Sequence, residues 1–582
     1  MGSSRFPGKM MREIAGKPLI WHVIHRLRQA RRVTRIILAT SDRPEDDALA
    51  AYAAGLVDTV VRGPEQNVLR RFVMALAHTD ADLILRITGD APLIDPGLID
   101  RLIDALERSG ADFAVTSGPG SDCGIDPITR RALLRIATER ADHPAAIEHV
   151  TGYLAVDPGF ASRCVVPVER ENRFIEGARF SIDTPTDLAF IEAIYRRLGA
   201  PAGEAQFLDV LRLLRAEPEL LAMNRHVRQR GAGEKPPAVL IRCDGGHEVG
   251  LGHVVRCLAI ASALRDHFGA AVTFLLGGDA AALDLVRAEA FPVIDAQSRA
   301  RDVRGLAAGL AAAAPDVLLM DLRAGFDTSE IAAIRDAGCA LAVLDDASDR
   351  RLHADLGFFF PPSATALDWR GARGEACIGF EWIPLRAQFS PPPARRRTEP
   401  KLALIVAGGS DPTGIGRRWL ESAARVLPHS WQIAIAIGAA AAADARLDDL
   451  VRNSGGRVAV YRQVSDMAGL MARAELSLAS FGMTAYELAS IGVPMLLLCL
   501  SEDHCRSAAA LAEKQAARVL GLAPAVADPE LDRAVAELAA DAAGRDAMSR
   551  NARALVDGLG ARRIAKRIAA LASRQVTRAG RA

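Results

Sequence analysis

Short apolar runs alternate with amphipathic stretches along most of the chain. The apolar runs indicate buried strands, and the stretches between them have the period of helices. The predicted strands are Arg35–Thr40, Asp58–Val61 and Leu83–Thr88, and the predicted helices are Pro18–Ala30 and Pro96–Arg108. Continuous apolar strands linked by helices are typical of parallel α/β sheets. The pattern runs to about Leu198, and Phe207–Val227 predicts a helical tail.

Two polar segments rich in proline interrupt this alternation. The first is Arg230–Pro237, and a new strand is predicted directly after it at Ala238–Arg242. The second is Ser390–Pro400, which precedes a predicted strand at Leu402–Ala407. Such segments are typical of connections between folding units. We therefore expect an N-terminal domain at 1–230, a linker at 231–237, and two α/β lobes at 238–389 and 401–575.

Composition supports well-packed globular domains. Half of the 582 residues are hydrophobic, a quarter are charged, and the formal net charge is +1. This balance excludes disorder, and it gives no basic field that would indicate a nucleic-acid partner. No apolar run is long enough to predict a membrane span or a signal peptide, so we expect a soluble, cytoplasmic protein. The eight cysteines form no C-x-x-C pair, which favours reduced thiols over a zinc site.

The first candidate for chemistry is the small-residue loop that ends at Lys9. Gly2, Ser3 and Ser4 permit close approach of backbone N–H groups to phosphates, and Arg5 and Lys9 supply positive charge. Many surface loops have this composition, so the loop alone is weak support. In the family that this loop and the later motifs resemble, an apolar strand leads into the loop. We therefore expect the natural protein to carry about ten more residues upstream, the length of one strand and its lead-in.

Two aspartates are candidate metal ligands. Gly89 and Asp90 follow the predicted strand Leu83–Thr88, and Asp183 ends a short predicted strand at Phe180–Asp183. Carboxylates at strand ends suit Mg²⁺, which prefers one or two carboxylates plus substrate phosphates. Thr184 with Asp187 also predicts a helix N-terminal cap, which leaves Asp183 itself unexplained.

The second half carries a glycine-rich turn after its first strand. Asp244 follows the strand by two residues, and Gly250 and Gly252 precede a helix that is predicted to begin near His253 and to include Arg256. The third glycine of a dinucleotide-binding fingerprint is missing, which argues against NAD. His253 is a candidate catalytic base, and the alternative is that it only caps the helix.

Two loops of the last lobe are candidate nucleotide sites, because helix N-termini with exposed N–H groups suit a pyrophosphate. Glu487 is positioned to accept ribose hydroxyls. The alternative is a Thr484–Glu487 capping box that needs no ligand. The candidate residues are Gly408, Gly409 and Ser410 in the first loop and Gly482, Thr484 and Glu487 in the second.

The N-terminal motifs together resemble a known family. They are Gly2–Lys9, Gly16–Leu19, Arg62–Phe72, Thr88–Leu93 and Ile182–Asp187. In this order they resemble cytidylyltransferases that activate octulosonate and sialic-type sugars, and most of all the branch of the spore-coat polysaccharide biosynthesis protein F. The resemblance implies that Arg5 and Lys9 hold the triphosphate of CTP, that Asp90 and Asp183 hold Mg²⁺, and that a sugar oxygen attacks the α-phosphorus. The substrate loop, Ser121–Asp126, departs from that branch.

The second half resembles the hydrolases that remove UDP from a diacetamido-trideoxyhexose on the pseudaminic acid route. The motifs are Arg242–Asp244, Gly250–Cys257, Asp345–Asp346, Pro384–Arg386, Gly408–Pro412 and Glu487–Pro494. The resemblance implies that His253 assists attack of water on the anomeric carbon and that the last lobe binds UDP, with Asp503 near it. Arg323 stands where the family often has tyrosine, and Asp503 where it often has asparagine.

Both resemblances imply steps in making CMP-activated nine-carbon sugars for flagellin or surface glycans. The expected fold class is α/β, with an N-terminal doubly wound nucleotidyltransferase (GT-A-like) domain and a C-terminal two-lobed (GT-B-like) module. The expected substrates are CTP, an acidic nine-carbon sugar and a UDP-sugar, and the hydrolase half needs no cofactor. Two alternatives remain open: the second half is a UDP-sugar glycosyltransferase, or one half is a non-catalytic nucleotide-binding scaffold. The oligomeric state is also open.

Overall fold

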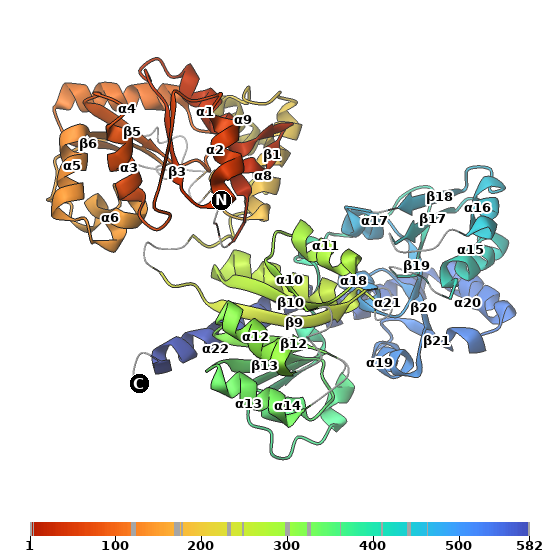
Figure 1. Ribbon diagram of the computed structural model, residues 1–582. Coiled ribbons are helices and arrows are strands. Elements are labelled where there is room, and N and C mark those ends of the chain that lie inside the picture. The colour runs from red at the N-terminus through yellow and green to blue at the C-terminus, as the bar shows by residue number, and fades with distance from the viewer. Residues whose placement is uncertain are drawn as a thin grey trace. The chain divides into compact units, whose positions relative to one another are not determined.

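A computed structural model shows two compact units, Met1–Pro236 and Pro237–Ala582 (Figure 1). The structure describes residues 3, 5–117, 124–167, 175, 178–229, 234–246, 250–296, 303–322, 327–360, 362–408, 411, 413–438, 444–462 and 464–579. The boundary falls between two prolines, in the polar segment that interrupts the hydrophobic pattern.

The first unit is a mixed α/β domain. Its strands are β1 Glu13–Ile14, β2 Lys17–Pro18, β3 Ile37–Ser41, β4 Thr59–Gly63, β5 Leu83–Ile87, β6 Phe113–Ser117, β7 Ile125–Thr129 and β8 Arg163–Pro167. Its helices are α1 Leu19–Gln29, α2 Asp47–Ala53, α3 Val68–Leu76, α4 Pro96–Ser109, α5 Arg130–Glu139, α6 Pro144–His149, α7 Tyr153–Val156, α8 Pro185–Leu198 and α9 Phe207–Ala216. The predicted strands and helices of the first hundred residues are confirmed within two residues at each end.

The sheet of the first unit is not wholly parallel. The strands β3 and β4 pair in parallel, while a four-stranded sheet has the order β5-β7-β6-β8. In that sheet β7 runs antiparallel to both of its neighbours. The expectation of parallel strands throughout is therefore wrong for β7. Helices α1 and α4 pack their apolar faces against strands of this unit and form its main core.

Two further expectations for the first unit need correction. Phe180–Asp183 forms no strand, because its backbone N–H groups are used outside a strand ladder: Ile182 donates to the carbonyl of Asp90, in a loop far away in the sequence, and Asp183 donates to the Asp187 carboxylate. The helical tail is also shorter than predicted. It consists of α9 and a 3₁₀ turn at Pro218–Ala222, since a proline cannot donate the N–H that would continue the helix.

The second unit contains two parallel sheets. The seven strands of the first are β9 Ala238–Gly245, β10 Ala271–Gly278, β11 Val293–Asp295, β12 Val317–Asp321, β13 Ala340–Leu344, β14 Leu356–Phe359 and β15 Glu375–Ile378. The helices between them are α10 Gly252–Phe268, α11 Ala280–Ala288, α12 Val303–Ala313, α13 Thr328–Asp336 and α14 Arg350–His353.

The six strands of the second sheet are β16 Leu402–Val406, β17 Gln432–Ile437, β18 Val458–Arg462, β19 Leu476–Ser480, β20 Met495–Cys499 and β21 Arg518–Leu522. The accompanying helices are α15 Ile415–Val426, α16 Ala445–Arg452, α17 Met467–Ala472, α18 Met483–Ile491, α19 Glu502–Glu513, α20 Asp528–Ala540, α21 Ala542–Leu555 and α22 Gly560–Ala579. The expected α/β fold with a two-lobed second half is confirmed.

Both sheets of the second unit share one topology. Their orders are β11-β10-β9-β12-β13-β14-β15 and β18-β17-β16-β19-β20-β21. In each, the chain starts in the middle, winds outward to one edge, and then returns to wind outward to the other. Open α/β sheets of this kind bind ligands at the carboxyl ends of the strands where the direction of winding reverses. The two reversal points lie between β9 and β12 and between β16 and β19.

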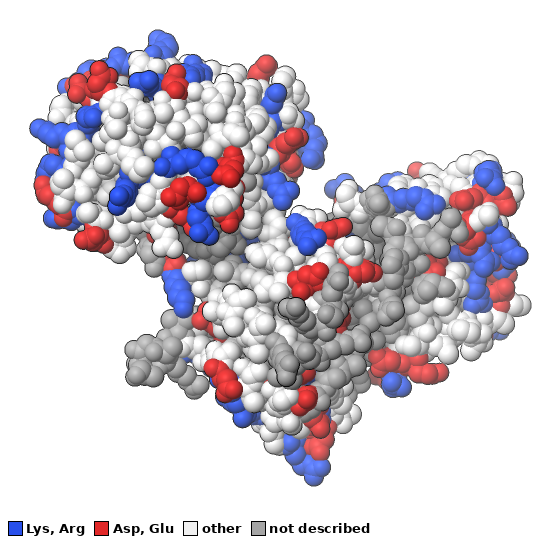
Figure 2. All heavy atoms as spheres, in the orientation of Figure 1, with Lys and Arg blue, Asp and Glu red and all other residues white. Residues whose placement is uncertain are grey.

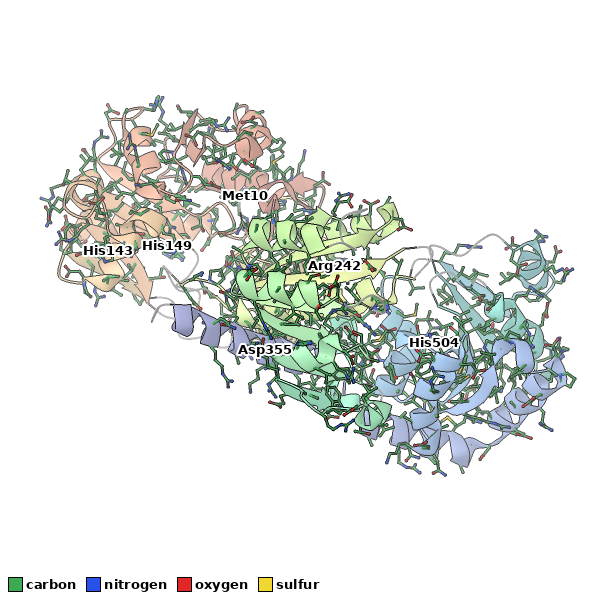
Figure 3. All side chains as sticks on the ribbon, turned by 60° about the horizontal axis from the view of Figure 1, so that its bottom comes forward. Met10, His143, His149, Arg242, Asp355 and His504 are labelled. Carbon is green, nitrogen blue, oxygen red and sulfur yellow. The ribbon has the colours of Figure 1, made fainter. Side chains whose placement is uncertain are left out.

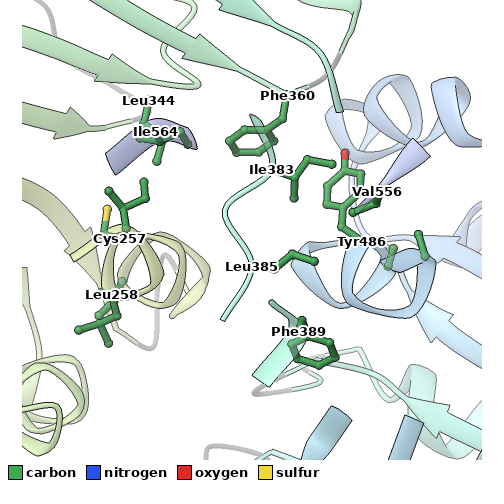
Figure 4. Close-up of a cluster of buried hydrophobic side chains, with 14 of the residues drawn as sticks. Cys257, Leu258, Leu344, Phe360, Ile383, Leu385, Phe389, Tyr486, Val556 and Ile564 are labelled. Carbon is green, nitrogen blue, oxygen red and sulfur yellow. The ribbon is translucent and has the colours of Figure 1, made fainter. Parts of the chain in front are cut away.

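A continuous apolar core joins the two lobes (Figure 4). It includes Cys257 of α10, Leu344 of β13 and Ile564 of α22, together with Tyr486 of α18. The segment that connects the lobes contributes Phe389, which is fully buried. Apolar side chains from both sheets are thus removed from water in one cluster. Burial of apolar surface is the dominant favourable term in folding.

Charged side chains are interspersed over the face seen in Figure 2, where blue and red atoms alternate and do not form one basic field. Within the described part of the chain, no helix is both long and apolar enough to cross a bilayer.

Candidate functional sites

The first unit gathers two carboxylates on one ammonium group. Lys9 donates from Nζ to Asp90 Oδ2 at 2.7 Å, to Asp183 Oδ1 at 3.0 Å and to the carbonyl of Ile182 at 2.7 Å. Asp90 lies three residues beyond β5, and Asp183 lies two residues before α8. The two candidate metal ligands, 93 positions apart in the sequence, therefore lie on opposite sides of one cation.

Asp183 is surrounded by positive charge. Besides Lys9, Arg5 approaches Asp183 Oδ2 at 3.1 Å, and Arg179 donates to the same oxygen at 2.8 Å. Burial raises the pKa of Asp183, but these three cations outweigh it and hold the pKa well below its usual range. Burial likewise lowers the pKa of Lys9, and the two carboxylates outweigh it, so its pKa lies above the ordinary value. Lys9 and Asp183 are therefore both charged near neutral pH.

A second layer of buried polar groups holds Asp183 in place. Thr184 and Asp187 form the predicted capping box at the start of α8, and Asp187 also accepts the backbone N–H of Asp183 at 3.0 Å. Asn224 donates from Nδ2 to Asp187 at 3.0 Å and to the carbonyl of Arg179 at 2.9 Å. Burial raises the pKa of Asp187. The cap and the site are thus parts of one network.

Glycine is required where the loops around Asp90 approach one another. Gly124 has a φ of +64°, and a Cβ there would lie 2.2 Å from Thr88 Oγ1. A Cβ on Gly89 would lie 3.2 Å from Cε of Met10, which Figure 3 labels. Beside them, Asp126 accepts from Arg86 at 2.7 Å and from Thr151 at 2.9 Å. Asp126 ends the described part of the predicted substrate loop.

In the second unit, the strongest polar cluster lies at the reversal point between β9 and β12. His253 approaches Asp321 Oδ1 through Nδ1 at 2.7 Å. Arg256 donates to the same carboxylate through Nε at 2.6 Å and Nη2 at 2.5 Å, and through Nη1 to Asp345 at 3.2 Å. Burial raises the pKa of Asp321, but Arg256 and His253 outweigh it and hold it far below the usual range.

The ionised Asp321 decides which nitrogen of His253 carries the proton. A carboxylate only accepts, so the short contact places the proton of the neutral ring on Nδ1 and the lone pair on Nε2. Nη2 of Arg256 also lies 3.1 Å from Nδ1, but it donates to Asp321 at the shorter distance of 2.5 Å. His253 does not cap α10, because that helix has Leu251 at its N-cap and no side-chain cap bond. The cap interpretation is wrong.

The glycines predicted for UDP-sugar binding lie at the two reversal points. Gly250 has a φ of +78°, and Gly252 begins α10, where an added Cβ would meet no atom within 4 Å. Gly408 follows β16 with a φ of +87°, and a Cβ there would lie 3.7 Å from Ser480 Oγ at the end of β19. Gly482 directly precedes α18. These positions leave backbone accessible where an α/β sheet binds its ligand.

Glu487 does not belong to a capping box. The N-cap of α18 is Gly482, without a side-chain cap bond, so the Thr484–Glu487 interpretation is wrong. Instead, Arg386 donates to both oxygens of the buried Glu487, at 2.7 and 2.9 Å. Burial raises the pKa of Glu487 and Arg386 opposes the rise. Each carboxylate oxygen keeps a further lone pair for a ligand hydroxyl.

Asp244 and Asp503 each pair with one arginine and are more exposed than Asp321 and Glu487. Asp244 lies at the end of β9 and pairs with Arg242, labelled in Figure 3, at 2.7 Å. Asp503 lies in the first turn of α19, exposed, and pairs with Arg506 at 3.2 Å. Several predicted residues lie outside the described part of the chain: Gly2, Ser4, Gly409, Ser410 and Arg323.

Comparison with known proteins decides the family of the first unit. The profile of the cytidylyltransferase family matches residues 1–214. The spore coat polysaccharide biosynthesis protein SpsF of Bacillus subtilis is 32% identical over 225 residues, which are 38% of this chain and 92% of that protein. The chain belongs to the cytidylyltransferase family.

Two other proteins are each similar to a part of this chain. The 3-deoxy-manno-octulosonate cytidylyltransferase of Anaeromyxobacter sp. is 30% identical over 37% of this chain and 80% of its own length. The solved structure of MurG from Acinetobacter baumannii covers 57% of this chain and 99% of its own, at 16% identity and a TM-score of 0.42.

The donor set of the cytidylyltransferase unit fits a magnesium ion. Asp90, Asp183 and the carbonyl of Ile182 present three oxygens to one cation, and Mg²⁺ binds oxygen ligands and completes its shell with phosphates and water. No group of three or more His, Cys, Asp or Glu side chains suited to a metal gathers among the described residues. A metal at Asp90 and Asp183 would complete its shell with water or with phosphate oxygens of the substrate.

Four residues contact the candidate residues without being assigned a role from the sequence, although the last belongs to a quoted motif: Arg179, Asn224, Asp321 and Arg386. Asp321 had a signal, because it is a carboxylate that ends an apolar run, as Asp90 follows one. The tail near Asn224 fits the branch of the spore-coat polysaccharide biosynthesis protein F, but the contacts of Arg179 with Asp183 and of Asn224 with Asp187 are created only by the fold.

Proposed function

We propose that the first unit transfers the cytidylyl group of CTP to an acidic sugar, with Mg²⁺ at Asp90 and Asp183. The observation that carries the proposal is the convergence of both carboxylates on Lys9, beside Arg5, in a chain of this family. A triphosphate carries about four negative charges, so its binding needs such a concentration of cations.

In this proposal the residues act by position and charge. Arg5 and Lys9 bind the phosphates, and Asp90 and Asp183 hold the metal. The metal supplies neutralisation of the charge that develops at phosphorus. A sugar hydroxyl gives up its proton to solvent as its oxygen forms a bond to the α-phosphorus, the bond to the bridging oxygen breaks, and pyrophosphate leaves with the electron pair. Positioning of this kind contributes several kcal/mol to catalysis, roughly 7–11 in the best cases.

The names of the relatives support an acidic sugar as acceptor. One is named for 3-deoxy-manno-octulosonate, and others for its 8-amino-3,8-dideoxy analogue. We propose a nine-carbon acid of the pseudaminic or legionaminic type, on the strength of the second unit. The test is to offer purified protein CTP, Mg²⁺ and a panel of eight- and nine-carbon acids, and to identify CMP-sugars by mass spectrometry. Product from none of them would refute this assignment.

For the second unit we propose hydrolysis of a UDP-diacetamido-trideoxyhexose. The observation that favours it is the 2.7 Å contact between His253 Nδ1 and Asp321 at a ligand-binding edge, which makes Nε2 the ring nitrogen that can accept a proton. Nε2 takes a proton from water as the water oxygen bonds to the anomeric carbon. The bond from that carbon to the phosphate oxygen breaks, and UDP leaves with the electron pair. Glu487 and the glycine loops of the second lobe would bind UDP.

A glycosyltransferase would use the same base to activate a sugar acceptor. The two functions differ in one measurable respect: the hydrolase releases UDP from the UDP-sugar in buffer alone, and the transferase needs an added acceptor. A scaffold would bind UDP and release nothing. UDP release without an acceptor therefore separates all three.

Replacement of Asp321 by asparagine tests the role assigned to His253. An amide can turn its NH₂ toward Nδ1 and favour the opposite tautomer, with no lone pair on Nε2. We expect UDP release to fall about 10²–10⁴-fold, as when a general base is lost. In ¹⁵N-histidine spectra, the His253 signals should change from the Nδ1–H to the Nε2–H pattern.

The Asp321→Asn protein is also expected to be less stable, because Arg256 loses its buried counter-ion, a change that typically costs about 3–5 kcal/mol. Circular dichroism is therefore measured alongside. A folded variant with an unchanged His253 tautomer would contradict the role of Asp321, whatever its activity.

A further inference from the structure

The ammonium of Lys9 has a full set of hydrogen-bond partners. A lysine ammonium carries three N–H donors. These go to Asp90 Oδ2, Asp183 Oδ1 and the carbonyl of Ile182, at 2.7, 3.0 and 2.7 Å. The side chain is about nine-tenths buried. Lys9 therefore has no donor left for a phosphate in this arrangement.

The partners of Lys9 are those that a hard divalent cation would choose. Two carboxylate oxygens and one backbone carbonyl surround a single compact charge, and Mg²⁺ also takes carboxylate and carbonyl oxygens, at about 2.0–2.1 Å. One site cannot hold both cations, because the ammonium already occupies the space between the carboxylates.

The residue type is also informative. Only six of the 72 basic side chains in this chain are lysines, and the others are arginines. Arg5 and Arg179 both contact the other carboxylate oxygen of Asp183, Oδ2. A planar guanidinium cannot reproduce the compact charge of a metal ion, whereas an ammonium can. Among the described residues, the side chain that contacts both Asp90 and Asp183 is thus a lysine.

We infer that Lys9 and a divalent cation compete for the same oxygens of Asp90 and Asp183, so that Lys9 must leave these carboxylates when a divalent cation binds there. Without it, two carboxylates would face each other in a partly buried site, which is unfavourable. Lys9 therefore keeps the site assembled. When the triphosphate binds, its oxygens can accept the hydrogen bonds of Lys9, which releases the two carboxylates for the metal. The nucleotide and the metal therefore increase each other's affinity.

This inference rests on the proposed role of Asp90 and Asp183 as metal ligands, and its test needs no turnover. Mn²⁺ alone is titrated into the full chain without nucleotide or sugar, and free Mn²⁺ is measured by electron paramagnetic resonance. Lys9→Met removes the competing charge and keeps the length of the side chain. We expect Mn²⁺ to bind this variant about tenfold more tightly than the wild type, the equivalent of one charge-assisted hydrogen bond.

Arg5→Met is the matched control. It also removes one positive charge from Asp183, but it leaves Lys9 between the carboxylates. We expect a smaller gain, about threefold or less, because Arg179 still donates to the same oxygen of Asp183. An equal gain in both variants would mean that only net charge matters and would overturn the inference, as would unchanged or weaker binding by Lys9→Met.

A second measurement uses the wild-type protein, in case Lys9→Met does not fold. With ¹⁵N-lysine, a buried and hydrogen-bonded ammonium gives a side-chain signal in water, and six lysines give a simple spectrum. Saturating Mg²⁺ should shift or remove the Lys9 signal. A Lys9 signal that stays in place while Mg²⁺ displaces bound Mn²⁺ would overturn the inference. Absence of CMP-sugar formation would refute the proposed function alone, since neither binding measurement depends on it.

Discussion

Asp90→Asn lowers the rate of CMP-sugar formation by about 10²–10³-fold or more and leaves the protein folded. The substitution keeps the size of the side chain and removes one of the two charges that hold the metal. Loss of one group that stabilises the developing charge typically has an effect of this size. The measurement is kcat and KM for CTP at saturating Mg²⁺. The effect should appear in kcat, because charge at phosphorus grows in the transition state.

Asp183→Asn is the natural comparison, and the structure predicts a different outcome for stability. Asp90 meets one cation, Lys9, whereas Asp183 meets Arg5, Lys9 and Arg179. Neutralising Asp183 leaves three cations facing one another, so its Tm should fall while that of Asp90→Asn stays near the wild type. Wild-type turnover in either variant would refute the metal-ligand assignment.

His253→Ala abolishes most UDP release while UDP still binds. Loss of a general acid or base typically lowers a rate about 10²–10⁴-fold. The imidazole is buried at the first lobe, and the residues proposed to bind UDP belong to the second lobe, so affinity for UDP should stay within about threefold by calorimetry. Wild-type rates from this variant would leave His253 a structural partner of Asp321.

Asp503→Asn serves as the control for the second unit. Asp503 is exposed on α19 and pairs with Arg506, so its neutralisation should not disturb the fold. It also removes a negative charge near the proposed anionic leaving group. We expect UDP release to be unchanged or faster. A large loss would mean that Asp503 itself takes part in the reaction.

The convergence of Asp90 and Asp183 was predictable from the sequence because both lie in motifs with a known place in a fold. The position of Lys9 was not. The loop composition predicted a phosphate ligand, whereas the structure places its ammonium between the two carboxylates. A motif identifies a residue type and its spacing, but the partner of a long, flexible side chain depends on charges brought together by the fold.

The same limit applies to the second unit. Apolar periodicity predicted β9, β16 and the glycine turns, because buried strands and helix starts have local signals. It could not show that Asp321 lies against His253, since the two are 68 positions apart and are joined only by the pairing of β12 with β9. The prediction of a strand at Phe180–Asp183 was wrong for a related reason. The run has the apolar pattern of a strand, but its backbone N–H groups donate to a carboxylate and to a carbonyl outside any strand.

Phosphorus NMR on one reaction mixture tests the central claim, that a single chain holds two independent nucleotide-sugar sites. The mixture contains the protein, CTP, Mg²⁺, a panel of acidic sugars and a panel of UDP-sugars. The wild type should produce both pyrophosphate and UDP. Asp90→Asn should lose only pyrophosphate, and His253→Ala should lose only UDP. A wild-type mixture without pyrophosphate, or one substitution that abolishes both products in a folded protein, would contradict the account.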